Sequence, residues 1–486
     1  MNQEFRYMKK YLLGIALIVA SSTQAQWQPI HASSIDSMLQ QYVYARQLSG
    51  VILVAKDNQV LYQKAIGMAD REKQMPNDIS TNFNIASMGK TFTATLIMQL
   101  IQEGKLSLHS TLESVLPKSG VQKADSITVY HLLTHSSGVG NYMMHKNYEQ
   151  DRTKLTSLAS LMPYVREMEP TMPYVGASHH YSNSGFILLG RIIETITGKT
   201  YIQNLQDRIF KKAGIQNSYI HYPATFEAPK EAVPYIAYTA KTYHNAVAEE
   251  FPAYSDGGMQ SNVIDLWRFG KALLTNQLLG QSFRDTMWKG RMDIGRGGKY
   301  AFGWIDNTNP WGKKVVSHDG GGKGFSTDLK LVVEDGYVVV VLLNNRVNPR
   351  EISNNILSII YTGQYQKPDK YLEIQLTETM EQKGFQYIVD NYTTILKEKG
   401  FDKTPSPWVI IRFSDMLENL GEYDKAYAIQ ELGRKEFPKE TSMYNITGQL
   451  LATQGKKAEA KQWFDKALAI DPKDEFARMM LKQLGL

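Results

Sequence analysis

The sequence predicts an α+β fold, in which an antiparallel sheet is flanked by helices and a helical subdomain, followed by an all-α C-terminal segment. Three observations lead to this prediction. Segments rich in β-branched and aromatic residues occur before residue 67 and again after residue 299. The stretch between them mixes short helical patterns with long polar connections. Beyond residue 364 the strand pattern stops, and helical sequence continues to the end.

The predicted sheet is assembled from segments that lie far apart in the chain. Segments 51–55 and 59–66 are separated by a polar tripeptide, which is typical of two strands joined by a tight turn. The Glu-Asp-Gly break at 334–336 predicts a second hairpin. Because these segments bracket a helical middle, we expect them to pair in one antiparallel sheet. The later strands are expected at 300–305, 314–317, 327–333 and 337–344.

Two helices of the middle region can be placed. Apolar residues recur at helical spacing over 96–101, and the pattern ends at Gly104. Ser87 therefore lies near the N-terminus of a predicted helix of about 15 residues. A second helix is expected over 186–197, closed by Gly198. The free amides of a first helical turn favour negative charge, which is relevant to the chemistry of Ser87.

Residues 1–25 have the pattern of a secretory signal peptide. Basic residues precede an apolar run at 12–20, and small residues flank a cleavage site after Ala25. The run is too short for a membrane-spanning helix, and a retained anchor is the alternative. We expect an exported protein, periplasmic or secreted, without a membrane span once the leader is removed. Translation starts at Met1 or at Met8.

Composition narrows the function classes. The chain contains 43% hydrophobic and 21% charged residues, as an ordinary globular protein does. It has no cysteine, so export needs no disulfide and the usual lipid anchor is excluded. The formal net charge of +6 is small for 486 residues, and no basic stripe with interleaved aromatic residues occurs. We therefore expect no nucleic-acid partner.

The helical segment 366–486 follows a polar linker and contains a repeat. Its second copy resembles a tetratricopeptide repeat, which implies a helical stack able to recruit a protein partner. Two repeats are fewer than such stacks normally need, so segment 371–399 is expected to complete or cap the stack. An unspecialised helical tail is the alternative. The matching positions are Tyr444, Gly448, Leu451, Ala460, Phe464, Ala467 and Pro472, and Gly421, Ala426 and Pro438 lie 34 positions before Gly455, Ala460 and Pro472.

Ser87 and Lys90 form a Ser-x-x-Lys motif. A serine nucleophile needs a base within hydrogen-bond reach and donors for the developing oxyanion. Residues three apart share a helical face, which brings the Lys90 amine next to the Ser87 hydroxyl. Lys90 can accept a proton only when neutral, and a Tyr181 phenolate stabilised by Lys90 is the other candidate base. The sequence leaves this choice open, and the motif alone is weak because such pairs are commonly just solvated.

Further motifs in a fixed order make the signal specific. They are the segments 83–90, 127–138, 181–185, 257–261 with Asp265 and Leu266, 302–304 and 317–321. Together they resemble the serine β-lactamase-like family, which contains class C β-lactamases, D-alanyl-D-alanine carboxypeptidases, D-aminopeptidases and related esterases. The resemblance spans residues 30 to 365 and implies a sheet and a helical subdomain with the site between them. It predicts a hydrolase domain at 26–365, before the helical domain at 366–486.

The resemblance implies a role for each residue of the candidate site. Ser87 is expected to be the nucleophile, and Lys90 and Tyr181 the proton-transfer pair. The side-chain amide of Asn183 is expected to hold substrate and to orient Lys90. The backbone amides of Ser87 and Gly321 are expected to form the oxyanion hole.

The third motif departs from the β-lactamase pattern, because the chain has His318-Asp319-Gly320 where Lys-Thr-Gly is usual. The resemblance places His318, Gly320 and Gly321 against the substrate. Lysine is always charged, whereas a histidine near its ordinary pKa of about 6.5 is often neutral and binds a carboxylate less well. Histidine variants are common among the esterase-like and aminopeptidase-like members. A packed strand residue is the alternative for His318.

Other candidate sites carry less weight. Gly89-Lys90-Thr91 resembles the end of a phosphate loop, but position 84 is Asn where that motif needs Gly. His179 and His180 have no carboxylate at ligand spacing, which favours a solvated or packed pair over a metal site. The glycines at 320–322 give no separate evidence for a cofactor, because a close approach of the backbone on the site strand explains them equally well. We expect neither a metal nor a cofactor.

The function favoured by the sequence is that of an exported serine hydrolase. It would form an acyl-enzyme on Ser87 and cleave an amide or ester bond in a small molecule or peptide, as an esterase or a D-amino-acid peptidase does. A β-lactamase or a D-alanyl-D-alanine carboxypeptidase is the alternative within the enzyme class. The alternative of another class is a binding protein for peptidoglycan-like peptides or a protein partner, without turnover.

Overall fold

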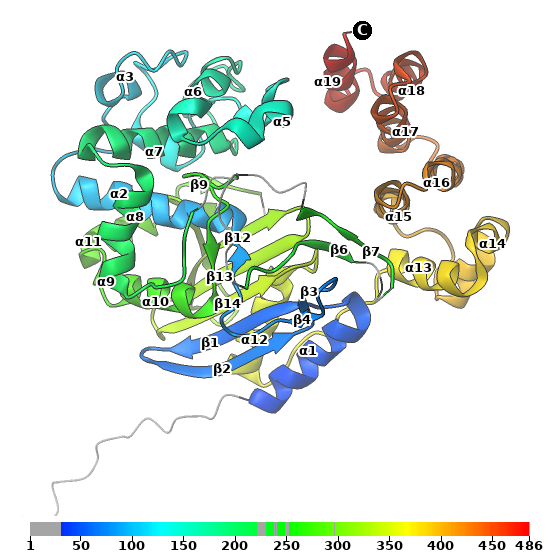
Figure 1. The fold of residues 1–486 in the computed structure, drawn as a ribbon, viewed down its shortest axis with the longest axis horizontal. Helices are drawn as coiled ribbons and strands as arrows, with labels where there is room; N and C mark the ends of the chain where they lie inside the picture. The colour runs from blue at the N-terminus through cyan, green and yellow to red at the C-terminus, as the bar shows by residue number, and fades with distance from the viewer. Residues whose placement is uncertain are drawn as a thin grey trace, which may run out of the picture.

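The computed structural model describes residues 31–220, 230–237, 239, 241–247, 252–295 and 297–485. The predicted signal peptide lies outside these residues. Within them the predicted fold class is confirmed, because an antiparallel sheet is flanked by helices and followed by a helical C-terminal region (Figure 1). In this part of the chain, no helix has both the length and the apolar character to cross a membrane.

The central sheet of the described residues has eight strands in the order β2-β1-β14-β13-β12-β11-β10-β9. Each neighbouring pair is antiparallel, and β1 joins the later strands through β14, with Gly50 opposite Leu343. The prediction of one sheet built from distant segments is thus confirmed. Its strands are β1 (Gly50–Lys56), β2 (Gln59–Ile66), β9 (Met292–Asp293), β10 (Lys299–Tyr300), β11 (Ile305–Thr308), β12 (Lys314–Gly322), β13 (Phe325–Val332) and β14 (Tyr337–Leu343).

Several predicted boundaries differ from those in the structure. The strand predicted at 300–305 is split between β10 and β11, because Gly303, with a φ of 70°, turns the chain between them. The strand predicted at 314–317 continues to Gly322 as β12. Short paired strands lie outside the main sheet: β3 (Met68–Asp70) with β4 (Met75–Pro76), β5 (Phe83–Asn84) with β8 (Gln260–Ser261), and β6 (Tyr235–Ala237) with β7 (Tyr243–Asn245).

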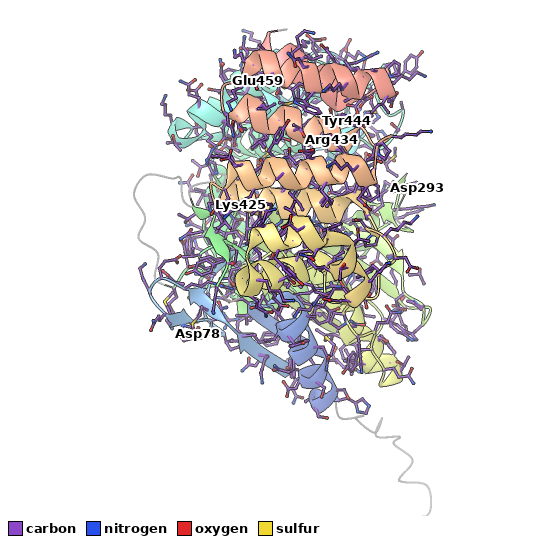
Figure 2. The ribbon with its side chains drawn as sticks, turned by 90° about the vertical axis from the view of Figure 1, so that its right-hand side faces the viewer. Asp78, Asp293, Lys425, Arg434, Tyr444 and Glu459 are labelled. Carbon is purple, nitrogen blue, oxygen red and sulfur yellow. The ribbon has the colours of Figure 1, made fainter. Side chains whose placement is uncertain are left out.

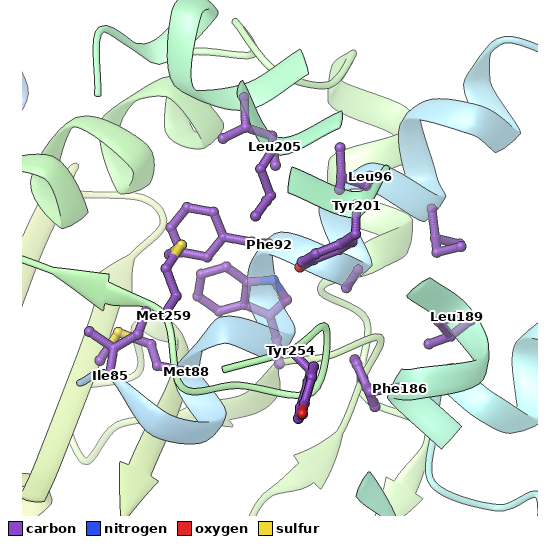
Figure 3. Packing of buried hydrophobic residues seen from close by; sticks show 14 of the residues in the cluster. Ile85, Met88, Phe92, Leu96, Phe186, Leu189, Tyr201, Leu205, Tyr254 and Met259 are labelled. Carbon is purple, nitrogen blue, oxygen red and sulfur yellow. The ribbon is translucent and has the colours of Figure 1, made fainter. Parts of the chain in front are cut away.

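Helices cover both faces of the sheet. Helices α1 (Ala32–Arg46) and α12 (Pro349–Thr362) pack on one face. The other face is covered by α2 (Lys90–Gln102) and α10 (Val263–Leu274), whose rings Phe92 and Phe269 stack at 3.8 Å. Figure 3 shows Ile85 and Met88, which lie two residues before and one residue after Ser87, in this core beside Met259. Burial of both residues anchors the turn that carries Ser87.

A group of shorter helices forms the predicted helical subdomain beside the sheet (Figure 1). Its longest member, α7 (Asn183–Thr197), begins three residues earlier than predicted and ends at Gly198, which adopts a φ of 66° as a left-handed cap. The others are η1 (Ala86–Gly89), α3 (Leu112–Val115), α4 (Val129–Leu133), η2 (Tyr142–Met144), α5 (Tyr148–Asp151), η3 (Arg152–Lys154), α6 (Leu158–Arg166), α8 (Tyr201–Leu205), η4 (Gln206–Phe210), α9 (Lys211–Ala213) and α11 (Gln281–Met287).

The C-terminal helices stack in pairs and curve away from the sheet, and Figure 2 looks onto this stack. Their hydrophobic core also takes in Ile236 and Ala246 from the β6–β7 hairpin. At the base of the stack, the Tyr371 ring lies close to two guanidinium groups, with its centre 3.8 Å from that of Arg46 and 5.2 Å from that of Arg412. The helices are α13 (Leu372–Lys383), α14 (Phe385–Glu398), α15 (Pro407–Asn419), α16 (Tyr423–Glu436), α17 (Ser442–Thr453), α18 (Lys457–Ile470) and α19 (Glu475–Leu484).

The helical region therefore shares packing with the part of the chain that contains the sheet. The boundaries predicted at residues 25 and 365 stay predictions. Around the second of these, α12 ends at Thr362 and α13 begins at Leu372.

Candidate active site

Ser87 lies on a tight 3-10 turn, η1, that leads directly into α2. Ala86, the residue before it, has a φ of 46°, a conformation that costs energy for any residue with a Cβ. The turn is held from outside by Gly258, whose amide donates to the Ala86 carbonyl at 3.1 Å. A Cβ on the neighbouring Gly257 would lie 2.5 Å from that same oxygen, so only glycine fits there.

Strand β12 passes close to the other side of this turn. A Cβ on Gly320 would lie 2.2 Å from the Ile85 carbonyl oxygen, so glycine at this position permits the approach. The Thr327 hydroxyl on β13 donates to the same carbonyl at 3.1 Å. Pairing of β12 with β11 stops at Ser317, which leaves the Gly320–Gly322 end of β12 beside the turn. The close approach thus explains Gly320, and Gly321 lines a cleft together with Ser87.

Lys90 is fully buried in the first turn of α2. Among the described residues, its Nζ lies 3.2 Å from Ser87 Oγ, 2.7 Å from Asn183 Oδ1 and 2.5 Å from the Asp256 carbonyl oxygen. It also lies 4.9 Å from the centre of the Tyr181 ring. Ser87, Lys90 and Asn183 thus meet, although 93 positions separate the last two in the sequence.

Tyr181 also contacts Ser87. Its hydroxyl donates to Ser87 Oγ at 2.8 Å, and 38% of the residue is exposed. The Asn183 and Asp256 oxygens on Lys90 accept hydrogen bonds and cannot donate them. Besides the proton of Ser87 itself, one further proton is therefore shared between Lys90 Nζ and the Tyr181 oxygen. Either a neutral Lys90 accepts the Ser87 proton, or a Tyr181 phenolate accepts it beside a charged Lys90.

His135 packs against Tyr181, a contact that the sequence did not indicate. It is almost completely buried, and its ring lies 4.1 Å from the Tyr181 ring. The Ser182 amide donates to His135 Nδ1 at 3.2 Å, so Nε2 carries the hydrogen and donates to the Tyr300 hydroxyl at 3.1 Å. Burial and the nearby Lys90 charge lower the pKa of His135 well below its ordinary value. This residue lies within the 127–138 motif, which was the signal that could have identified it.

His318 is buried on β12 at the far end of this chain of hydrogen bonds. Its Nδ1 lies 2.6 Å from the Asp319 carbonyl, so it carries the hydrogen, and Nε2 accepts from the Tyr300 hydroxyl at 3.0 Å. Burial, and to a lesser extent the Lys90 charge, lower the pKa of His318 to about 4. This pKa is lower than the ordinary histidine value used in the sequence analysis, so the ring is neutral over a wider pH range. Both ring nitrogens are bonded within the protein, as in the packed alternative.

The cleft beside Ser87 has a volume of about 150 Å³. Asp256, which the sequence reasoning also missed, forms part of its wall and accepts a hydrogen bond from the Tyr142 hydroxyl at 3.1 Å. Burial raises the pKa of the Asp256 carboxyl to about 6, although the Lys90 charge opposes this rise. The cleft is lined by Asn84, Ala86, Ser87, Met143, Asn183, Pro252, Asp256, Gly257, Gly258, Gly321, Gly322, Lys323 and Phe325.

Comparison with known protein families agrees with this geometry. The sequence profile described as Beta-lactamase matches residues 35–361, which is more than half of the chain. The chain belongs to the β-lactamase family. This is a family of serine hydrolases, and the motif resemblance is thereby confirmed. A tetratricopeptide repeat profile matches residues 441–474, which confirms the resemblance found there.

Relatives of this β-lactamase-family chain have several activities in their names. A penicillin-binding protein of Bacillus subtilis is 27% identical over 349 residues, which cover 67% of this chain and 75% of that protein. The esterase EstB of Burkholderia gladioli is 25% identical over 313 residues, 56% of this chain and 79% of the esterase. A D-aminopeptidase of Brucella anthropi is 25% identical over 322 residues, 64% of this chain and 58% of that enzyme.

Solved structures show the same fold. The octameric penicillin-binding protein homologue from Pyrococcus abyssi has a TM-score of 0.61 and 25% identity, covering 73% of this chain and 82% of that one. The D-amino acid amidase from Ochrobactrum anthropi SV3 has a TM-score of 0.59 and 23% identity, covering 68% of this chain and 98% of the amidase. The β-lactamase-family fold is shared, and the family hosts more than one reaction.

Proposed function

We propose that this serine hydrolase is exported, forms an acyl-enzyme on Ser87 and cleaves an amide or ester bond in a small molecule or peptide. The observation that carries the proposal is that one hydroxyl, that of Ser87, contacts both the Lys90 amine and the Tyr181 phenol at the wall of a cleft. A serine hydroxyl is a weak nucleophile, and an adjacent base is what activates it.

Acylation begins when Ser87 Oγ attacks the substrate carbonyl carbon and gives its proton to Lys90 or Tyr181. The new C–O bond forms as the carbonyl π electrons move onto oxygen. The amides of Ser87 and Gly321 are proposed to donate to that oxyanion. The position of Ser87 supports this role, because its backbone amide lies in the first turn of η1, where amides have no acceptor within the helix. As the bond to the leaving group breaks, the base returns the proton to the departing nitrogen or oxygen.

Deacylation requires a group that can deprotonate water next to the acyl-enzyme. Lys90 is fully buried, whereas more than a third of Tyr181 is exposed. Tyr181 is therefore the more accessible of the two residues to water. We infer that Tyr181 takes the proton of the attacking water and then returns a proton to Ser87 Oγ as the acyl group leaves. Asn183, bonded to Lys90, is proposed to orient it and to contact the substrate.

The substrate is inferred from the third motif. A neutral His318 supplies no charge for a substrate carboxylate, which a Lys-Thr-Gly lysine would supply. We therefore favour an esterase or a D-amino-acid peptidase over a β-lactamase or a D-alanyl-D-alanine carboxypeptidase. The names of EstB and of the D-aminopeptidase support this choice. In addition, the N-terminal pattern supports a periplasmic or secreted location, and the repeat supports a protein partner.

Covalent labelling tests the nucleophile. After incubation with a fluorophosphonate, the intact mass of the wild-type protein should increase by one adduct, and that of Ser87→Ala should not change. Ser80→Ala, which removes an exposed serine, is the matched control and should be labelled like the wild type. Equal labelling of Ser87→Ala would exclude the proposal. Rates with p-nitrophenyl esters, D-amino-acid amides and nitrocefin would then rank the substrate classes, and rapid turnover of nitrocefin alone would favour a β-lactamase.

A further inference from the structure

Asp256 contacts the candidate site in two ways. Its backbone carbonyl accepts a hydrogen bond from Lys90 Nζ at 2.5 Å. Its carboxyl group, in a residue that is only 4% exposed, accepts from the Tyr142 hydroxyl at 3.1 Å. The residue also lines the cleft beside Ser87. A buried carboxyl group is thus fixed near the amine whose protonation decides which group is the base.

The turn that carries Asp256 leaves it little freedom to move. Tyr254 and Gly257 pair across the turn through hydrogen bonds of 2.8 and 3.2 Å between their backbones. The carbonyl of Ser255 accepts from the Thr93 hydroxyl at 2.6 Å, and the Ser255 hydroxyl donates to the Phe186 carbonyl at 2.9 Å. These contacts tie the turn to α2 and α7, the helices that hold Lys90 and Asn183. These contacts hold the backbone of Asp256 in place, and the hydrogen bond from Tyr142 holds its carboxyl group.

We propose that the Asp256 carboxylate is a positioning group that keeps the shared proton on Lys90, so that Tyr181 accepts the proton of Ser87. This inference rests on the proposed function and assigns the base within it. A negative charge on a residue that is only 4% exposed stabilises a nearby ammonium group more than it would in bulk water. Lys90 then donates to Ser87 Oγ, and the Ser87 hydrogen points to the Tyr181 oxygen.

The groups that face the Asp256 carboxyl come from three elements. Lys90 on α2 supplies the positive charge, the Tyr142 hydroxyl on η2 donates a hydrogen bond, and Tyr148 on α5 lies within electrostatic reach. Lys323 lies on the cleft side. Because burial raises the pKa of Asp256 to about 6, the carboxylate charge is lost as the pH falls through that value. Lys90 then loses its counter-charge, and the proposed arrangement is disfavoured.

The test is the pH dependence of acylation in the full chain. The second-order rate constant for fluorophosphonate labelling is measured by intact mass from about pH 5 to about pH 9, together with kcat and KM for a p-nitrophenyl ester. The wild-type rate should fall below about pH 6, as expected for a group that must be ionised. Asp256→Asn preserves the side-chain volume, and its labelling rate should not decrease in this way below about pH 6. It should also be slower by about tenfold at alkaline pH, in kcat more than in KM, as a loss of about one pKa unit of electrostatic support predicts.

Tyr142→Phe is the second variant, because it keeps the Asp256 charge and removes the hydrogen bond that lowers the pKa of the carboxyl. The decrease of its labelling rate in acid should therefore occur at a higher pH than in the wild type. Asp328→Asn is the matched control, since Asp328 is also a buried carboxyl with a raised pKa but contacts Ser353 on α12. Its profile should match that of the wild type.

Two failures can be told apart. If wild-type Ser87 is labelled but the profiles of Asp256→Asn and Tyr142→Phe match the wild type, the role of Asp256 is wrong and the proposed function stands. If Asp256→Asn does not fold, an unmoved profile in Tyr142→Phe alone overturns the inference. If the wild type is not labelled at Ser87, the proposed function itself fails.

Discussion

The Tyr300 hydroxyl lies 3.0 Å from Nε2 of His318, and the tautomers on either side allow it only one orientation. His318 Nδ1 donates to a backbone carbonyl, so Nε2 must accept, and Tyr300 must donate to it. Protonation of His318 would place a second hydrogen between these two atoms, and the hydroxyl hydrogen of Tyr300 would lose its acceptor. The hydrogen-bond pattern and the low pKa therefore agree on a neutral His318.

The first prediction concerns Tyr300→Phe. The change removes the acceptor of the His135 Nε2 hydrogen and the donor to His318, and each buried orphan group costs about 1–3 kcal/mol. We expect a lower melting temperature and a loss in kcat of about tenfold, because His135 packs against Tyr181 and orients it. Calorimetry and ester hydrolysis measure the two effects. Tyr392→Phe, which removes a buried hydroxyl near Thr404 in the helical region, should lower stability and leave kcat unchanged.

The second prediction concerns stability in acid. The pKa of His318 is about 4 in the folded chain, below the ordinary value of about 6.5, so the unfolded chain binds the proton first. The stability contribution is complete above about pH 6.5 and is lost as the pH falls towards 4, by about 3 kcal/mol at most. His318→Gln cannot take up this proton. Its melting temperature should therefore fall less than that of the wild type between about pH 7 and about pH 4.5.

Other groups titrate over the same range, and the comparison accounts for them. Asp256 has a raised pKa of about 6, so it contributes in the opposite direction, binding its proton first in the folded chain. This contribution is the same in both proteins, and the difference between them isolates His318. Parallel melting curves at every pH would contradict a neutral, buried His318.

The third prediction concerns the glycines that surround the Ser87 turn. In Gly257→Ala the new Cβ would lie 2.5 Å from the Ala86 oxygen, and in Gly320→Ala it would lie 2.2 Å from the Ile85 oxygen. Both neighbours are backbone atoms, so the turn itself must shift, and a displacement of about 1 Å costs about 100-fold in rate. Gly280→Ala is the control, because its Cβ meets only the end of the Gln102 side chain at 3.2 Å. Wild-type rates of Ser87 labelling in Gly257→Ala would refute this account of the turn.

Much of the fold could be predicted from the sequence because its signals are local. Alternation and turn residues located the hairpins of β1–β2 and β13–β14, and the cap at Gly198 located the end of α7. The split between β10 and β11 was missed, because it depends on the conformation of Gly303 and not on residue type. The prediction that Ser87 lies at a helix start was close, since η1 continues into α2.

The candidate site was only partly predictable, because its supporting residues meet through tertiary contacts. Ser87 and Lys90 are three positions apart, so helix geometry alone relates them. In contrast, His135 and Tyr300 are 165 positions apart, and no local spacing relates them. The depressed pKa of His318 results from burial, which no local pattern reports. The role of Asp256 could not be predicted for the same reason, although this residue immediately precedes a segment that matched the family.

The last prediction concerns removal of the helical region after Lys367. The truncated chain loses the cover over Ile236 and Ala246, which share the core of that region, and the Tyr371 ring that stacks on Arg46. Exposure of these groups should lower the melting temperature, at about 25 cal/mol per Å² of apolar surface exposed. We expect ester hydrolysis to survive at low temperature, because the contacts of Ser87 come from residues before this point. Thermal unfolding and fluorophosphonate labelling of both chains measure the two effects. A truncated chain that melts like the full one would show that the shared core does not stabilise the hydrolase region, whereas loss of labelling in a folded truncated chain would show that the helices shape the site.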